Sequence, residues 1–247
     1  MTTWMSPISS SEATNVLLHR DRVSGEVQVE VAFTGNGIDL AERPDDSRAT
    51  EAAVTRLADV LSVPVVRMRQ VHGVDVHQVV RGADGSFGPV PEADALVTVE
   101  RGVALMARSA DCVPVVLADA TTGVVGAVHA GRVGFDLGVV GRCVQQMRDL
   151  GAGRLRAWVG PAACGSCYEV PAEMRDDVAS RHPAAASTTS WGTPALDVPA
   201  GVVAELRALD VEVTELGPCT IEDERTFSHR REQGRAGRSG ALVWVAA

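Results

Sequence analysis

The chain has 247 residues, 45% hydrophobic and 22% charged, the composition of an ordinary soluble globular protein large enough to bury a core. Its net charge of -9 argues against nonspecific binding to nucleic acids or to anionic membranes. All 23 basic residues are arginine, which excludes Schiff-base chemistry, a Walker-type phosphate lysine and a hydrolase with a catalytic lysine. The five cysteines are too few and too scattered for a disulfide framework.

The first residues, MTTWMSPISSSE, lack a charged segment followed by an apolar run, so we expect no secretory signal. No stretch approaches the roughly 18 uninterrupted apolar residues of a membrane span. We therefore expect a cytoplasmic protein that acts on small molecules, without membrane or nucleic-acid partners.

Apolar periodicity indicates interleaved strands and helices. Period-two and β-branched runs predict strands at 27–33, 63–73, 74–80, 95–99, 103–107, 155–159 and 241–245. Helical spacing predicts helices at 49–61, 135–150, 171–182 and 199–210, the second with Leu137, Val140, Val144 and Met147 on one side. Surface loops are expected at 82–94 and 183–195. Because strands and helices do not alternate strictly, we predict one α/β domain over 1–247 with mixed or antiparallel sheets.

Residues 109–134, SADCVPVVLADATTGVVGAVHAGRVG, predict a β-hairpin with ATTG at its turn. A turn centred between Ala120 and Thr121 would place Cys112 directly opposite His129. Residues in that relation have Cβ atoms about 5 Å apart on the same face of the sheet, within reach of a common ion. A bulge or an odd-length loop would break this pairing, and Pro114 restricts its strand to the first residues or to an edge.

A third ligand is available in RMRQVHGVDV, where His72 lies at a strand end just before a glycine. Two histidines and one cysteine, with a fourth position open, are the ligand count of a catalytic zinc site. The alternative is that His72, Cys112 and His129 are unrelated packed or surface residues.

Several short sequence motifs follow one another in a characteristic order: QVHG (70–73), DALVT (94–98), SADCVPVVLAD (109–119), VHAG (128–131), VGP (159–161), CYEV (167–170), CT (219–220) and FSHRR (227–231). Together they resemble the laccase-domain family, also called the polyphenol oxidase or purine nucleoside phosphorylase family. The resemblance runs from about residue 63 to the C-terminus and leaves 1–62 as a divergent N-terminal part.

This resemblance implies a layered α/β sandwich with central sheets and outer helices, and a zinc ion bound by His72, Cys112 and His129. The activities it implies are phosphorolysis of purine nucleosides and deamination of adenosine, with an editing role on peptidoglycan precursors in some members. A multicopper oxidase is not expected, because such centres need several histidines per metal and the chain has six in all.

Other candidate catalytic and binding residues lie in or beside these motifs. Asp111 is the candidate for proton transfer, although its position next to Cys112 favours a turn or a supporting role, since strand neighbours face opposite sides. Arg132 is the second catalytic candidate; it follows VHAG, where the family usually has Trp and then a basic residue. Gln70, Arg230 and Arg231 are candidates for binding phosphate or substrate. Arg230 and Arg231 belong to a C-terminal arginine cluster, and guanidinium groups suit phosphate. The alternative is that this cluster is a solvated loop without a binding role.

The altered HAGRV segment, and an N-terminal region that lacks the family's usual Thr-Arg-x-Gly-Gly, leave two alternatives open. One is a noncatalytic zinc-containing binding protein, and the other is a metal-free hydrolase of a cell-wall precursor with Cys112 as nucleophile and His129 as base. The CGSC segment at 164–167 has redox or zinc-knuckle spacing, but no second Cys pair accompanies it, so we predict a structural loop.

Overall fold

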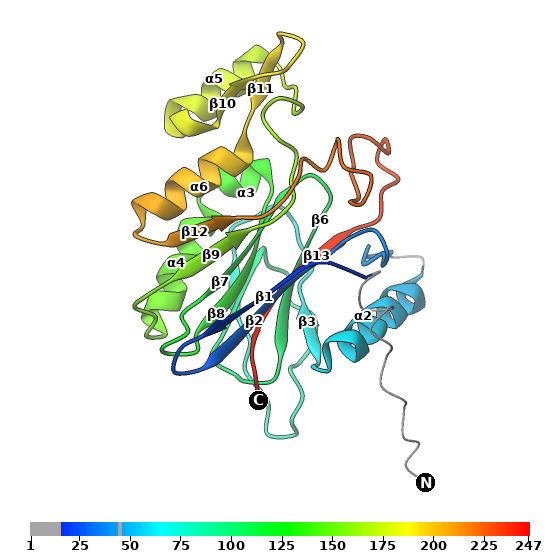
Figure 1. The fold of residues 1–247 in the computed structure, drawn as a ribbon, viewed down its shortest axis with the longest axis vertical. Coiled ribbons are helices and arrows are strands. Elements are labelled where there is room, and N and C mark those ends of the chain that lie inside the picture. The colour runs from blue at the N-terminus through cyan, green and yellow to red at the C-terminus, as the bar shows by residue number, and fades with distance from the viewer. Residues whose placement is uncertain (1–15, 44–45) are drawn as a thin grey trace.

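Two β-sheets lie face to face at the centre of the protein, with helices on their outer sides (Figure 1). The computed structural model describes residues 16–43 and 46–247, so the predicted absence of a signal at the very start lies outside them. The first sheet has the order β1 (Leu17–Ser24), β2 (Gln28–Thr34), β13 (Ser239–Val245), β6 (Ala104–Ser109) and β3 (Val65–Arg67). The second has the order β12 (Glu212–Glu215), β9 (Arg156–Val159), β7 (Val113–Ala118), β8 (Val125–Ala130), β5 (Ala95–Thr98) and β4 (Val76–Gln78).

Most strand pairs are antiparallel, and β3–β6, β4–β5 and β9–β12 are parallel. This mixture confirms the predicted α/β domain with mixed sheets, and the outer helices confirm the layered sandwich. None of the described helices is long and apolar enough to cross a membrane.

Three apolar layers hold the sandwich together. One lies between the two sheets and includes Val31, Val116 and Trp158. A second lies between the six-stranded sheet and the helices α4 (Val139–Asp149), α5 (Ala172–Arg181) and α6 (Val198–Ala208). The third lies under α2 (Ser47–Leu61). Because both faces of β6, β7 and β8 are covered, every residue of these strands is buried, which explains their continuous apolar runs.

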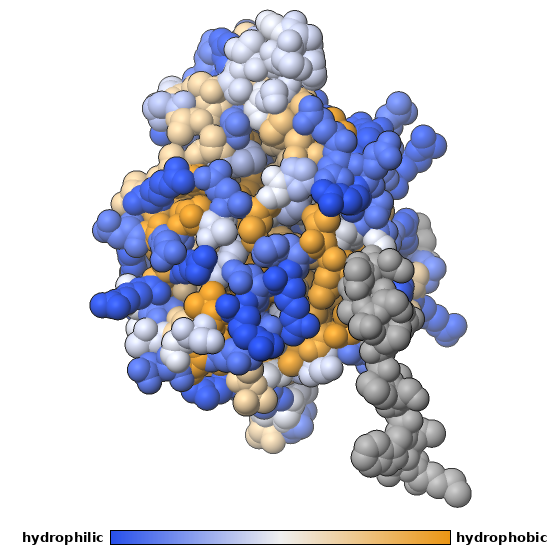
Figure 2. Space-filling model, in the orientation of Figure 1, coloured by the Kyte–Doolittle hydropathy of each residue, from blue (hydrophilic) through white to orange (hydrophobic). Residues whose placement is uncertain are grey.

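Helix α2 covers only part of the outer face of its sheet. It begins at Asp46, whose side chain accepts a hydrogen bond from the Ala49 N–H. Hydrophilic side chains gather over β1 and β2 beside it (Figure 2). On this face the buried Glu30 carboxylate accepts bonds from Arg20 at 3.1 Å and Arg22 at 2.5 Å, so that a charge within the sheet is compensated.

The predicted hairpin is present as β7–β8, but its predicted register is wrong. Pro114 pairs with His129 and Ala118 pairs with Val125, so the four-residue turn is centred one residue later than expected. The Asp119 carboxylate fixes this turn by accepting N–H bonds from Thr121 and Thr122. Cys112 therefore precedes the strand and does not face His129 across the hairpin.

Other predictions also need correction. The strand predicted at 63–73 ends at Arg67, because the chain crosses there to the other sheet and enters β4. The helix predicted at 135–150 is divided into α3 (Arg132–Asp136) and α4 by Gly138, whose φ of 87° breaks the helix, and Leu137 is 60% exposed. The loop predicted at 183–195 contains a short 3-10 helix, η1 (Pro183–Ala185), and a hairpin of β10 (Ala186–Thr188) and β11 (Pro194–Leu196). Strands β1 and β12 were not predicted.

Candidate metal centre and its cavity

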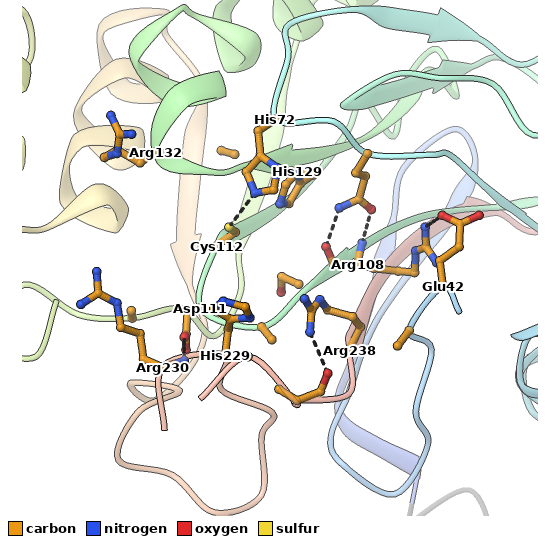
Figure 3. Close-up of a pocket in the computed structure, with 18 of the residues that line it drawn as sticks. Glu42, His72, Arg108, Asp111, Cys112, His129, Arg132, His229, Arg230 and Arg238 are labelled. Atoms are coloured by element: carbon orange, nitrogen blue, oxygen red, sulfur yellow. Dashed lines mark hydrogen bonds and ion pairs between the residues drawn. The ribbon is translucent and has the colours of Figure 1, made fainter. Parts of the chain in front are cut away.

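A cavity of about 720 Å³ lies at one end of the sheets, where loops from distant parts of the chain meet (Figure 3). Its walls come from the segment after β3, the connection between β6 and β7, the end of β8 and residues 229–238. This volume suits a small-molecule ligand.

His72, Cys112 and His129 meet on one wall of this cavity. One donor atom from each residue lies within 4.8 Å of the other two. His72 Nε2 is 3.7 Å from Cys112 Sγ, and the two imidazole rings stand nearly perpendicular with their centroids 4.8 Å apart. The predicted convergence of these side chains is thus present, and together they form a group that can hold a metal ion.

Each of the three residues is placed by a different local feature. His72 belongs to the crossover between the sheets and has a φ of 62°, which turns its side chain toward β8. Cys112 lies one residue before β7, and His129 is the second-last residue of β8. The hairpin brings the last two near each other only because Val113 pairs with Ala130 at its open end.

Asp94 fixes both histidines and was not predicted as a functional residue. Its fully buried carboxylate accepts a bond from His129 Nδ1 at 2.8 Å and from the N–H groups of Val71 at 3.2 Å, His72 at 3.0 Å and Gly73 at 2.6 Å. A carboxylate on Nδ1 leaves Nε2 of His129 available to the cluster and sets the ring orientation, as in many metal sites. The only signal in the sequence was an acidic residue directly before the apolar strand of DALVT.

The electrostatics of the cluster favour the metal-binding form of the cysteine. Burial alone would raise the pKa of Cys112, but hydrogen bonds to His129 and His72 lower it to about 6. Burial would lower the pKa of His129, and its bonds to Asp94 and Cys112 raise it to about 9. Burial would also raise the pKa of Asp94, yet the bonds from His129 and the Gly73 N–H hold it below its usual value. The metal-free group is therefore a thiolate beside an imidazolium, whose proton a cation would displace.

Space for the cluster depends on Gly131. A Cβ atom at this position would lie 2.5 Å from His72 Cδ2 and 3.3 Å from Cys112 Sγ. The last glycine of VHAG therefore keeps a cradle open beside two of the donor atoms, and the residues present fit a bound metal ion.

Gln70 and Asp111 both line the cavity, but their polar atoms are engaged with the protein. Gln70 exchanges two hydrogen bonds with the backbone of Arg108, at 2.7 and 2.9 Å. The Asp111 carboxylate accepts bonds from Thr220 Oγ1 at 2.6 Å and from the Arg230 N–H at 2.7 Å. Asp111 thus ties the C-terminal segment to the cavity, in agreement with the supporting role favoured by its position.

The predicted basic residues separate into two groups. Arg132 and Arg230 line the cavity, and Arg230 is held with its guanidinium 4.6 Å from the Tyr168 ring centroid. Arg231 is not among the residues that line the cavity. Its guanidinium donates to the carbonyl oxygens of Thr220 at 2.6 Å and Asp223 at 3.1 Å, and so it holds the loop together.

Further residues line the cavity, and of these Arg238 belongs to the C-terminal arginine cluster that the sequence offered for phosphate binding. The Arg108 guanidinium is buried and donates to Glu42 at 3.0 Å. His229 and Arg238 lie across the cavity from His72 and His129 (Figure 3). Both come from the segment between β12 and β13, which only the tertiary fold brings to this site.

Known proteins resemble the chain over most of its length. Residues 28–246 match the family described as multi-copper polyphenol oxidoreductase laccase, so the match begins ahead of residue 63. The chain is 46% identical over 230 residues to a Streptomyces coelicolor protein named purine nucleoside phosphorylase, which covers 91% of this chain and 93% of that protein. It is 49% identical over 207 residues to a Streptomyces griseus protein of the same name, covering 81% and 83% respectively.

Solved structures show the same fold. A Neisseria meningitidis protein of the DUF152 family superposes with a TM-score of 0.74 at 25% identity, covering 92% of this chain and 99% of that one. The YlmD protein of Geobacillus stearothermophilus superposes with a TM-score of 0.73 at 29% identity, covering 89% and 92%.

Proposed function

The chain belongs to the laccase-type polyphenol oxidoreductase family, and on this premise we propose that it is a zinc-dependent purine nucleoside phosphorylase. The observation that carries the proposal is that the His72–Cys112–His129 group and cationic side chains face one cavity. A nucleoside needs such a cavity, and phosphate needs the cations. The names of the curated relatives support the same substrate class.

The proposed reaction joins a phosphate oxygen to C1′ of the nucleoside and breaks the bond between C1′ and N9. The purine leaves with the electron pair of that bond and takes up a proton, and the pentose is released as its 1-phosphate. A zinc ion bound by the three ligands would act as a Lewis acid that stabilises charge developing in the substrate.

The residues of the chain bind and orient the reactants. Arg132, on the first turn of α3, and Arg230, steadied by Tyr168, are the proposed phosphate ligands. Asp111 positions Arg230 through its backbone N–H. Gln70 holds the segment before His72 against β6 and so keeps that ligand in place.

We propose deamination of adenosine as a second activity of the same site. Water would then take the place of phosphate and add to the purine ring, and ammonia would leave. The two activities are separable, because only the first requires phosphate.

Copper oxidase chemistry does not suit the donor set. Of the six histidines in the chain, His72 and His129 belong to the cluster and His182 contacts Asp136. A blue-copper site takes a weak axial Met, and a trinuclear centre needs several imidazoles per metal. The donor set therefore favours zinc despite the family's description.

The test is product analysis with metal-loaded protein. Inosine and adenosine are incubated with and without phosphate, and free base, pentose 1-phosphate and ammonia are measured. We expect base and pentose 1-phosphate only with phosphate, and loss of both in His72→Ala but not in the matched variant His77→Ala, whose exposed imidazole lies on β4. Absence of base and ammonia release across a panel of purine nucleosides would overturn the proposal.

The arrangement of Cys112, His129 and Asp94 favours a second candidate function, because it matches the catalytic groups of a Cys-His-Asp hydrolase. The substrate proposed for this hydrolase is a cell-wall precursor. Such an enzyme would need no metal. Full activity on that substrate after chelation, retained in His72→Ala, would favour it over the zinc enzyme.

A further inference from the structure

A second group of metal-binding side chains lies apart from the first. Cys164, Cys167, Cys219 and Glu222 each offer a donor atom within 4.8 Å of the others. The CGSC segment lacks a second Cys pair nearby in sequence, but Cys219 supplies a third sulfur from 52 residues further along the chain.

The topology of the sheet explains this meeting. Strands β9 and β12 are parallel neighbours, so the segments that leave their C-terminal ends run side by side. Ala162 and Cys219 continue this pairing as an isolated bridge, with the Thr220 N–H donating to the Ala162 carbonyl at 3.0 Å. The two segments that carry the donors are therefore held in register by the backbone.

A backbone N–H group and a hydroxyl also lie against two of the sulfurs. Cys219 Sγ accepts the Cys164 N–H at 3.3 Å. Cys164 Sγ lies 3.1 Å from Ser166 Oγ. N–H donors aimed at a thiolate favour its charged form, and the turn at 164–168, closed by N–H bonds from Cys167 and Tyr168 to the Cys164 carbonyl, brings both of its sulfurs to one side.

We propose that Cys164, Cys167, Cys219 and Glu222 bind a second zinc ion with a structural role. Three thiolates and one carboxylate fill the four positions of tetrahedral zinc, and thiolate-rich sets select zinc among the common divalent cations. Binding releases the thiol protons, and the two positive charges of the ion offset half of the four negative charges that would otherwise repel. A disulfide would use only two of the three sulfurs and would leave the third unexplained.

The place of this site in the fold indicates what it does. Residues 216–238 connect β12 to β13 without a helix or strand, and they carry His229 and Arg230 to the cavity. The CGSC turn leads directly to Tyr168, which supports Arg230. A metal ion that joins the two segments binds the folded chain and not the unfolded one, so its binding free energy adds to the stability of this loop. The second zinc therefore stabilises the wall of the cavity opposite the first.

The test is zinc content of the full chain after purification under reducing conditions and dialysis. We expect two zinc ions per wild-type chain, one in His72→Ala, one in Cys167→Ser and none in the double variant. Glu224→Gln, which changes a neighbouring exposed carboxylate, is the matched control for Glu222→Gln. Only Glu222→Gln should weaken the binding of the second zinc ion. A single zinc in the wild type that disappears in His72→Ala would overturn the proposal, as would a disulfide between any two of the three cysteines under these conditions.

A spectroscopic measurement on the His72→Ala chain covers the case in which Cys167→Ser fails to fold. Cobalt(II) bound to this variant should show the strong charge-transfer absorption of several thiolates, and zinc should protect three thiols from alkylation and raise the midpoint of thermal unfolding. Cobalt absorption with the intensity of one thiolate, or no protected thiols, would contradict the assignment. Because the first site is disabled in this variant, the outcome is independent of the proposed phosphorolysis.

Discussion

Replacing Asp94 with asparagine tests whether one buried carboxylate organises the metal ligands. The substitution keeps the shape of the side chain but turns one oxygen into an NH₂ donor. Oδ1 accepts from His129 Nδ1 and the His72 N–H, and Oδ2 accepts from the Val71 and Gly73 N–H groups. Whichever way the amide is placed, two donors lose their acceptor.

The size of the effect follows from these contacts. Each buried donor without a partner costs about 1–3 kcal/mol, so the metal-free variant should be less stable by roughly 2–6 kcal/mol. Loss of a partner that orients a metal-bound histidine typically weakens metal affinity by about 10- to 100-fold, or roughly 1.4–2.7 kcal/mol. We therefore expect Asp94→Asn to lower both the stability of the metal-free protein and its affinity for zinc.

Denaturant unfolding after chelation measures the stability of the metal-free protein, and competition with a chromophoric chelator measures its affinity for zinc. Asp75→Asn is the matched control, because Asp75 is an exposed carboxylate on the same connection. Wild-type zinc affinity in Asp94→Asn would refute the reasoning, since the histidines would then be oriented by something other than this carboxylate.

Three further predictions concern the same cavity. Gly131→Ala should abolish zinc binding at the first site by displacing His72. Gly153→Ala, whose Cβ would meet only Asp119 Oδ2 at 4.0 Å, should leave the zinc content unchanged. Metal analysis of the two variants measures the difference. In chelator-treated protein, alkylation of Cys112 should increase as pH rises through about 6, because its lowered pKa makes it a thiolate above that value, and zinc should block the reaction. Alkylation that sets in only at the pH of an ordinary thiol would contradict the lowered pKa. Arg230→Ala should raise KM for phosphate by roughly 10- to 100-fold. Arg225→Ala, which removes an exposed partner of Asp223, should leave this KM unchanged. An equal effect of the two substitutions would contradict the assignment of Arg230 as a phosphate ligand.

The sequence predicted that His72, Cys112 and His129 lie close together, although the register predicted for the hairpin was wrong. The register of the hairpin was wrong because the side chain of Asp119 shifts the turn by bonding to N–H groups after it, and the apolar pattern carries no sign of this. His129 and Cys112 still meet, because both lie at the open end of the same hairpin. The sequence placed His72 at the end of a strand, but that strand ends at Arg67, and His72 reaches the cluster through the crossing between the sheets, which no local pattern predicts.

The sequence did not indicate a function for Asp94 or Cys219, because the partners of both residues lie far away in the chain. The partners of Asp94 are backbone N–H groups more than twenty positions away, and no local pattern marks them. Cys219 joins the CGSC turn only because β9 and β12 are adjacent, although α5, η1, β10, β11 and α6 lie between them in the chain. Periodicity predicts single strands well, whereas the order of strands in a sheet depends on contacts spread over the whole chain.

The most direct test of the proposed function is the yield of ribose 1-phosphate from inosine by zinc-loaded protein. We expect one equivalent of ribose 1-phosphate for each hypoxanthine released, only in the presence of phosphate, and none from His129→Ala. Hypoxanthine released equally without phosphate, or no release by protein that holds its full complement of zinc, would contradict it.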